Sequence, residues 1–268
     1  MSHTLSLQEL QKKELEILKI FHAFCDKHQL RYYLYYGTLL GAVRHNGFIP
    51  WDDDVDVIMP RNDYKKFIEL FPKYNQIPYI KMASLTNTPE FYLPLIKLYD
   101  SRTPLTESVL KHPLSLGPWI DIFPLDNMSD EYSKAKHLFQ RVSFWRRLRS
   151  WKLFIPSGMW IKRKVKVLLQ YVLFFVPTPF ILHKIDKLSQ IYNAQEFTKY
   201  IGIVSHGAYG LQGIMDKKLY ENRILHPFED TAFYIPEGFD SVLTHLYGDY
   251  MTPINNQNAR HFDDTQIG

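Results

Sequence analysis

Four aspartates fall within five residues of the stretch WDDDVDVIMP, at positions 51–60. Alternate side chains of a β-strand point to the same side, so Asp54 and Asp56 are expected to project together. Carboxylates placed side by side repel one another, and burying them without a partner costs free energy. A divalent cation removes that cost, and Mg²⁺ prefers oxygen ligands while leaving positions for substrate phosphates. The spacing therefore predicts a Mg²⁺ (or Mn²⁺) site on these two aspartates.

Two further acids are candidates for the same metal site. Asp52 has the same phase as the first pair, whereas Asp53 points to the opposite side and is the least favoured ligand. Asp121 lies between two isoleucines in PWIDIFPLD and would add a carboxylate from a neighbouring strand. The alternative is a solvated acidic edge strand that binds nothing. The apolar residues Val57, Ile58 and Met59 favour a buried strand instead.

A candidate phosphate site precedes the acids. The stretch RYYLYYG predicts a strand ending at Gly37, and residues 38–44 predict a short helix that begins directly after it. The start of a helix presents free backbone N–H groups and the positive end of its dipole to an anion. We expect the amides of Gly37 and Thr38 to hold phosphate oxygens, with the Thr38 hydroxyl as an additional donor. Together with the acids, this pair predicts a phosphate-plus-metal site.

Residues 35–59, YYGTLLGAVRHNGFIPWDDDVDVIM, resemble the signature of the LicD family within the nucleotidyltransferase superfamily. The superfamily pattern of a glycine pair, an acid–hydrophobic–acid strand and a later single acid falls on Gly37-Thr38, Asp54-Val55-Asp56-Val57 and Ile120-Asp121-Ile122. Thr38 stands where a smaller residue is usual. The resemblance covers most of residues 10–252 and is weakest in the basic stretch described below.

The resemblance implies an α+β fold, with a nucleotidyltransferase-type mixed sheet and a mostly helical basic region. It also implies transfer of phosphocholine from CDP-choline to a sugar hydroxyl of a surface polymer precursor, of the teichoic acid or lipopolysaccharide type. Asp54, Asp56 and Asp121 would then be the catalytic residues, with Asp121 also suited to take the proton of the attacking hydroxyl. Donors carrying ribitol, glycerol or ethanolamine remain alternatives, because the motif does not distinguish them.

Several other side chains are candidate donor contacts. Arg44, His45 and Lys97 could bind the diphosphate, although a polar loop role for His45 and a surface strand charge for Lys97 are the alternatives. Trp51 offers an aromatic face to a choline ammonium by cation–π attraction, with core packing as the alternative. Tyr35 and Tyr36 are candidates for the same aromatic contact, and the remaining candidates are polar residues in aromatic surroundings: His206, Glu229 and Asp249.

The chain has 268 residues and a net charge of +4, and we divide it into three parts. Residues 1–130 form the predicted catalytic core, residues 131–190 a basic amphipathic helical region, and residues 191–268 a part that completes the cleft. The single cysteine, Cys25, excludes an internal disulfide and a cysteine-based zinc site. Charges interrupt the N-terminus, which predicts no signal peptide, and prolines break the apolar run at 167–182, which predicts no membrane span.

The basic region predicts contact with an anionic surface. No acidic residue occurs from Tyr132 to Ile185, and Lys134–Lys166 carries lysines and arginines interleaved with Trp145, Trp151 and Trp160. Such a composition suits a helix at the headgroup level of a membrane. We therefore expect residues 134–182 to dock a cytoplasmic, peripheral enzyme on the inner face of the membrane, where a lipid-linked glycopolymer acceptor is found. A solvated basic helix is the alternative.

Two rival functions share parts of this pattern. An RNA nucleotidyltransferase would use the same acids and bind RNA with the basic region, but the sequence contains no recognisable RNA-binding module, so no nucleic-acid partner is expected. A non-catalytic binding protein would use the basic and aromatic surface alone, and it would have no need of in-phase aspartates beside a helix start.

Overall fold

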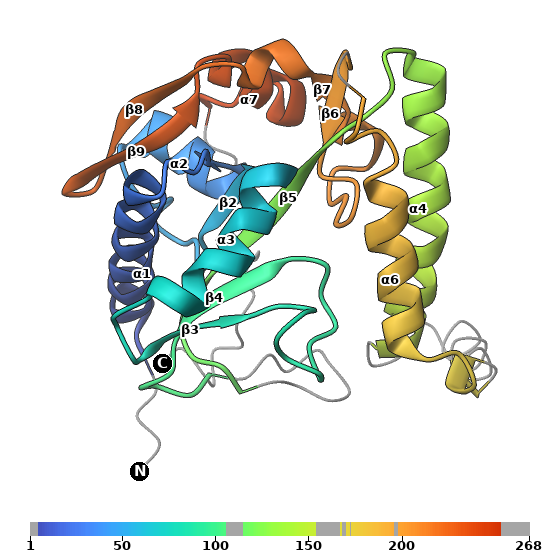
Figure 1. Cartoon of the computed structure of the whole chain (residues 1–268). Coiled ribbons are helices and arrows are strands. Elements are labelled where there is room, and N and C mark those ends of the chain that lie inside the picture. The colour runs from blue at the N-terminus through green and yellow to red at the C-terminus, as the bar shows by residue number, and fades with distance from the viewer. Residues whose placement is uncertain are drawn as a thin grey trace.

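A curled mixed sheet forms the centre of the molecule (Figure 1). The computed structural model describes residues 5–105, 115–153, 167, 170–171, 173–195 and 198–252. The strands of the sheet run in the order β1-β2-β5-β4-β3, and β6 and β7 extend it from β5. Their bounds are β1 Tyr33–Leu34, β2 Asp56–Pro60, β3 Ile80–Ala83, β4 Ile96–Asp100, β5 Trp119–Asn127, β6 Tyr200–Gly202 and β7 Met215–Asp216. Within this sheet β2 and β5 are parallel and the other pairs are antiparallel.

Helices and a hairpin cover the sheet. The helices are α1 Leu7–Lys27, α2 Tyr36–His45, α3 Arg61–Tyr74, α4 Tyr132–Leu153, α6 Thr178–Ser189 and α7 Phe239–Tyr247, and the hairpin pairs β8 Arg223–Phe228 with β9 Thr231–Pro236. Helix α1 begins at a capping box, in which Ser6 Oγ accepts the Glu9 amide and the Glu9 carboxylate accepts the Ser6 amide. The sequence predicts this cap, and the structure confirms it.

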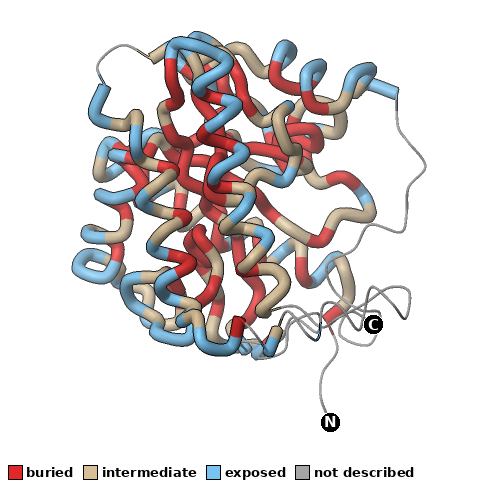
Figure 2. The backbone as a smooth tube through the Cα atoms, turned by 90° about the vertical axis from the view of Figure 1, so that its right-hand side faces the viewer, coloured by how far each residue is buried: buried red, intermediate tan, exposed pale blue. Residues whose placement is uncertain are grey.

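The two largest hydrophobic clusters of the described residues hold these layers together. The main cluster joins α1, α2 and α3 to the central strands and the hairpin, and Figure 2 shows its buried residues at the middle of the molecule. The second cluster lies between α4 and α6, which run side by side at one edge of the molecule (Figure 1). Apolar residues of α4 such as Leu138 and Val142 pack there against Ile181 and Ile185. The basic helix α4 therefore has one buried face.

The predicted mixed α/β architecture is confirmed, but the boundary before the phosphate site is wrong. β1 ends at Leu34 and α2 begins at Tyr36, so Gly37 lies inside the helix and not at the end of a strand. Tyr36 has a φ of +44°, a conformation that bulky residues rarely adopt. Its ring packs against Phe123 and Tyr209, and this packing overrides the strand propensity of a tyrosine-rich stretch.

In the described part of the chain, no helix is long and apolar enough to cross a membrane. Trp160 and much of the predicted membrane-docking stretch lie outside the described residues. The three-part division of the chain stays a prediction.

Candidate active site

The strand register places two aspartates next to each other. β2 and β5 are parallel, and Asp56 lies directly opposite Asp121. Residues opposite each other in a ladder share a face of the sheet, so both carboxylates project to the same side. Val57 and Ile122, the next pair along, are fully buried on the other face. The predicted arrangement of one acid on each of two neighbouring strands is therefore present.

The three aspartates before β2 converge on one point. The carboxylates of Asp52, Asp53 and Asp54 each offer an oxygen within 4.8 Å of the others. Asp53 is fully buried, whereas Asp52 and Asp54 are partly exposed. The regular strand begins only at Asp56, so the strict alternation assumed for this segment does not apply to it. The structure thus brings Asp53, the least favoured ligand by sequence, into the acidic cluster, which we define as Asp52, Asp53, Asp54, Asp56 and Asp121.

This acidic cluster carries more negative charge than the nearby cation balances. Burial, and then the charges of Asp54, Asp121 and Asp52, raise the pKa of Asp56 well above its usual range, while Lys97 acts in the opposite direction. Lys97 Nζ lies 2.9 Å from Asp121 Oδ1 and 3.8 Å from the centroid of the Trp119 ring. The lysine is only 3% exposed, so its interpretation as a surface charge is wrong. Converging carboxylate oxygens with excess negative charge match the ligand preference of Mg²⁺ or Mn²⁺.

A sixth acid, absent from the sequence prediction, faces the cluster from α1. Glu14 is 1% exposed, and burial followed by the charges of Asp54, Asp53, Asp52 and Asp121 raises its pKa well above its usual range. One turn earlier on the same helix, Gln11 Nε2 donates to the backbone oxygen of Asp52 at 2.8 Å. No described residue hydrogen-bonds Glu14 Oε2. A glutamate on the otherwise apolar stripe of α1 was the sequence signal for this residue.

The start of α2 meets the acidic cluster. Thr38 Oγ1 accepts the Asp56 amide at 2.8 Å, so its own O–H remains able to donate. A Cβ on Gly37 would lie 2.7 Å from Asp52 Oδ2, so a larger residue at this close approach would displace the Asp52 carboxylate. The N-cap residue Tyr35 makes no side-chain capping bond. The first-turn amides of α2 can therefore serve a phosphate bound beside the acids.

Other candidate residues have structural contacts elsewhere. Arg44 and His45 end α2, some 9 Å along the helix from Thr38 at 1.5 Å per residue, and Arg44 Nη1 donates to the Tyr250 backbone oxygen at 2.9 Å. Trp51 packs against the main hydrophobic cluster. Glu229 Oε1 accepts the Phe48 amide at 3.0 Å, so this carboxylate supports the turn that follows α2.

The remaining candidates divide between the core and the surface. Tyr35 and Tyr36 are buried in the main cluster, and Tyr35 shares a hydroxyl hydrogen bond with Tyr220. Asp249 is exposed and accepts the Thr252 hydroxyl at 2.7 Å. His206 packs edge-on against Phe123, with a centroid distance of 4.8 Å.

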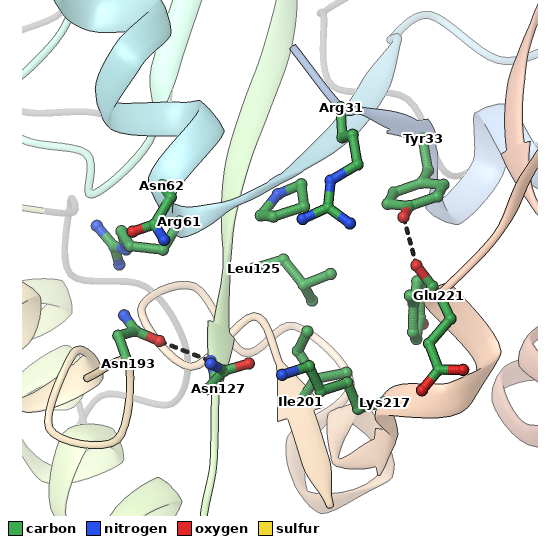
Figure 3. Close-up of a pocket in the computed structure, with 12 residues that line it drawn as sticks. Arg31, Tyr33, Arg61, Asn62, Leu125, Asn127, Asn193, Ile201, Lys217 and Glu221 are labelled. Carbon is green, nitrogen blue, oxygen red and sulfur yellow. Dashed lines mark hydrogen bonds between the residues drawn. The ribbon is translucent and has the colours of Figure 1, made fainter. Parts of the chain in front are cut away.

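A separate cavity of about 200 Å³ opens at the opposite ends of β2 and β5 (Figure 3). Arg31, Arg61, Asn127 and Lys217 line it, and Asn193 accepts the Asn127 amide at its edge. Asp56 and Asp121 lie near the start of the same strands, so a rise of about 3.3 Å per residue separates this cavity from the acidic cluster by more than 10 Å. Its basic groups are therefore not part of the candidate active site.

The chain is similar to known proteins over almost its whole length. Residues 29–151 match the family model described as LicD/FKTN/FKRP, nucleotidyltransferase domain. The lipopolysaccharide cholinephosphotransferase LicD of Haemophilus influenzae is 30% identical over 270 residues, which cover 98% of each chain. An uncharacterised protein of Rickettsia typhi is 39% identical over 72 residues, covering 26% of this chain and 23% of the relative. The 30% identity over almost the full length of a LicD protein, together with the match to the family model, shows that this chain belongs to the LicD family.

Proposed function

We propose that the chain is a phosphotransferase of the LicD type, which transfers phosphocholine from CDP-choline to a sugar hydroxyl of lipopolysaccharide. The observation that carries this proposal is the near-full-length similarity to a lipopolysaccharide cholinephosphotransferase. The acidic cluster beside the start of α2 supports it, because a diphosphate donor needs both a cation site and backbone donors. The mixed sheet is consistent with a nucleotidyltransferase fold.

Each part of the site has a role in this reaction. A Mg²⁺ or Mn²⁺ ion held by Asp54, Asp56 and Asp121, with Asp52 and Asp53 adjacent, would neutralise charge on the donor diphosphate. The amides of Gly37 and Thr38 bind phosphate oxygens and orient the donor. Most of the rate enhancement in phosphoryl transfer comes from such positioning and charge neutralisation.

Asp121 is suited to receive the proton of the attacking hydroxyl. It comes from β5, whereas the other members of the acidic cluster belong to β2 and the segment before it. Its ion pair with Lys97 fixes the orientation of the carboxylate. Asp121 then accepts the hydroxyl proton as the phosphorus–oxygen bond to the sugar forms and CMP leaves.

A peripheral membrane contact is also part of this proposal. Tyr171, Phe174 and Phe175 are exposed by 72%, 75% and 85%. Near the end of the basic helix α4, Lys152 Nζ donates to the Leu173 backbone oxygen at 3.0 Å, so these aromatics lie close to α4. Exposed aromatics beside lysines and arginines favour binding to the surface of an anionic membrane. Liposome flotation tests this contact. The variant Phe174→Ser/Phe175→Ser is expected to float less than wild type, whereas Leu225→Ser, on the distant β8, is expected to float normally.

The test of the function is release of CMP from CDP-choline in the presence of Mg²⁺, with and without lipopolysaccharide. Acceptor-dependent release that disappears in Asp54→Ala/Asp56→Ala would support the proposal. Release of CMP only from CDP-ribitol, CDP-glycerol or CDP-ethanolamine would change the proposed donor but leave the proposed active site as it is. No release with any CDP donor would refute the proposed reaction, and incubation with RNA and nucleoside triphosphates then tests the nucleotidyltransferase alternative.

A further inference from the structure

Two arginines occupy the buried stripe of α4. Ala135, Leu138 and Val142 form the apolar face of this helix at spacings of three and four residues. The same spacing continues to Arg146 and Arg149, where core residues would be expected. Arg149 is 7% exposed, and burial lowers its pKa to about 10. The guanidinium group is still charged at neutral pH, so the fold buries a cation here.

The charge of Arg149 is not balanced within the described residues. No hydrogen-bond acceptor among them reaches its Nε or Nη1 atom. The sequence from Tyr132 to Ile185 contains no acidic residue, so α4 itself supplies no carboxylate. Burying a cation without a partner is costly, and native proteins rarely do so without a function.

A buried arginine elsewhere in the chain shows the usual solution. Arg61, at the cavity in Figure 3, is 6% exposed and binds Asp126 through two hydrogen bonds of 2.7 and 2.6 Å. It also binds Asp186 at 2.8 Å. Arg61 therefore has two carboxylate partners, whereas Arg149 has none among the described residues.

The second arginine of the pair is held in place by a glycine turn. Arg146 Nη1 donates to the Val204 backbone oxygen at 3.2 Å, and its guanidinium lies 4.6 Å from the centroid of the Phe139 ring. Gly207 has a φ of +61°, and a Cβ there would overlap Arg146 Nη1 at 1.3 Å. Burial lowers the pKa of Arg146 to about 10 as well. Only a residue without a side chain leaves room for this guanidinium.

Both arginines line one cavity. The cavity has a volume of about 680 Å³, and its wall also includes Ser143, Ser150 and His206. The ring of His206 packs on Phe123, and Phe123 packs on Tyr36, the first residue of α2. Phe123 follows Asp121 by two residues on β5, so the two side chains project from the same face of the sheet. The arginine cavity therefore adjoins the start of α2, where the donor phosphates are expected.

We infer that Arg146 and Arg149 form an anion subsite that binds a phosphate group of a substrate. The inference rests on the proposed function and extends it with residues outside the acidic cluster. Paired guanidinium groups bind phosphate through several charge-assisted hydrogen bonds, with serine hydroxyls as additional donors. The phosphate belongs either to the CDP donor or to a phosphorylated acceptor.

Binding of inorganic phosphate is the first test, because it needs no turnover. The melting temperature is measured with and without phosphate, in the presence of a chelator, for wild type, Arg149→Met and Arg146→Gln. The control is Arg141→Gln, which removes the same charge from an exposed position of α4 outside this cavity. Phosphate is expected to raise the melting temperature of wild type and the control, and to raise those of the two cavity variants less.

A second readout separates a ligand role from a structural role. Without phosphate, Arg149→Met is expected to melt at or above the wild-type temperature, since it removes a buried unbalanced charge. A phosphate response in both cavity variants equal to that of the control would overturn the inference. An inactive wild-type protein whose phosphate binding depends on both arginines would refute the proposed function alone.

Steady-state kinetics then identify the source of the phosphate. Loss of charge-assisted hydrogen bonds is expected to raise one KM about 10- to 100-fold in the cavity variants. A raised KM for CDP-choline alone assigns the subsite to the donor. A raised KM for phosphorylated lipopolysaccharide, but not for its dephosphorylated form, assigns it to the acceptor. Unchanged values for both substrates, together with unchanged phosphate binding, would exclude the subsite.

Discussion

Asp56→Asn is expected to stabilise the metal-free protein. The side chain is 8% exposed, and burial and three neighbouring carboxylates disfavour its charged form. Asparagine has almost the same shape, and its amide can donate to those carboxylates. Removing an incompletely balanced buried group changes stability by about 1–3 kcal/mol. Each kcal/mol moves the melting temperature by about 2–4 °C in a chain of this size, so we expect a rise of about 2–12 °C in chelator at neutral pH.

In the presence of Mg²⁺, wild type is expected to be more stable than Asp56→Asn. At a concentration of 100 times its Kd, a ligand that binds only the folded state adds about 2.7 kcal/mol to its stability. Wild type gains this increment and the variant, lacking a ligand oxygen, gains much less. Scanning calorimetry in chelator and then in Mg²⁺ measures both effects, with Asp26→Asn on the exposed surface of α1 as the control. A variant that is less stable than wild type in chelator, combined with a wild type that ignores Mg²⁺ and Mn²⁺, would refute the metal-site reasoning.

Three further substitutions test other parts of the structure. Glu14→Gln is expected to be more stable than wild type in chelator, because the raised pKa of Glu14 means that its ionisation disfavours the folded state. The difference in stability should grow as the pH rises above the ordinary glutamate pKa of 4.5. Melting curves across pH measure it, and a difference in melting temperature that does not change with pH would contradict the prediction. Gly37→Ala should displace the Asp52 carboxylate, whose oxygen would lie 2.7 Å from the new Cβ. We expect kcat to fall by about tenfold or more, while helix stability rises by about 0.5–1 kcal/mol. An unchanged kcat would show that Asp52 is not part of the active site. Arg61→Met should lower the free energy of unfolding in urea by about 3–5 kcal/mol, because Asp126 stays buried without its bidentate partner. A decrease of less than about 1 kcal/mol would show that the pair contributes as little as a surface salt bridge.

The acidic strands could be predicted from sequence because their pattern is local. Alternation identified the strand of Asp56, and the isoleucines around Asp121 identified its neighbour. The convergence of Asp53 could not be predicted in this way, since the chain before β2 is irregular and alternation holds only for a regular strand. The start of α2 was misplaced because the positive φ of Tyr36 depends on packing against residues far along the chain.

The missed charged residues share one property. Glu14 and Arg149 each occupy a position on the apolar stripe of a helix, where leucine or isoleucine would ordinarily stand. By composition Arg149 belongs to a uniformly basic region, and only its position in the periodicity of α4 distinguishes it from its solvated neighbours. The periodicity of charges, read together with that of apolar residues, distinguishes a solvated lysine or arginine from one that the fold buries.

The turn that follows α2 has a consequence for dissecting the molecule. Glu229 accepts the Phe48 amide with its side chain and donates its own amide to the Asn46 oxygen at 2.7 Å, and a Cβ on Gly47 would overlap its carboxylate. β6 likewise pairs with the end of β5. A fragment cut to residues 29–151 would thus lose α1, the hydrogen bonds from Glu229 and the pairing of β6 with β5. It would also expose an unpaired sheet edge prone to aggregation. The stretch that the family model matches is accordingly smaller than the unit that has to be expressed.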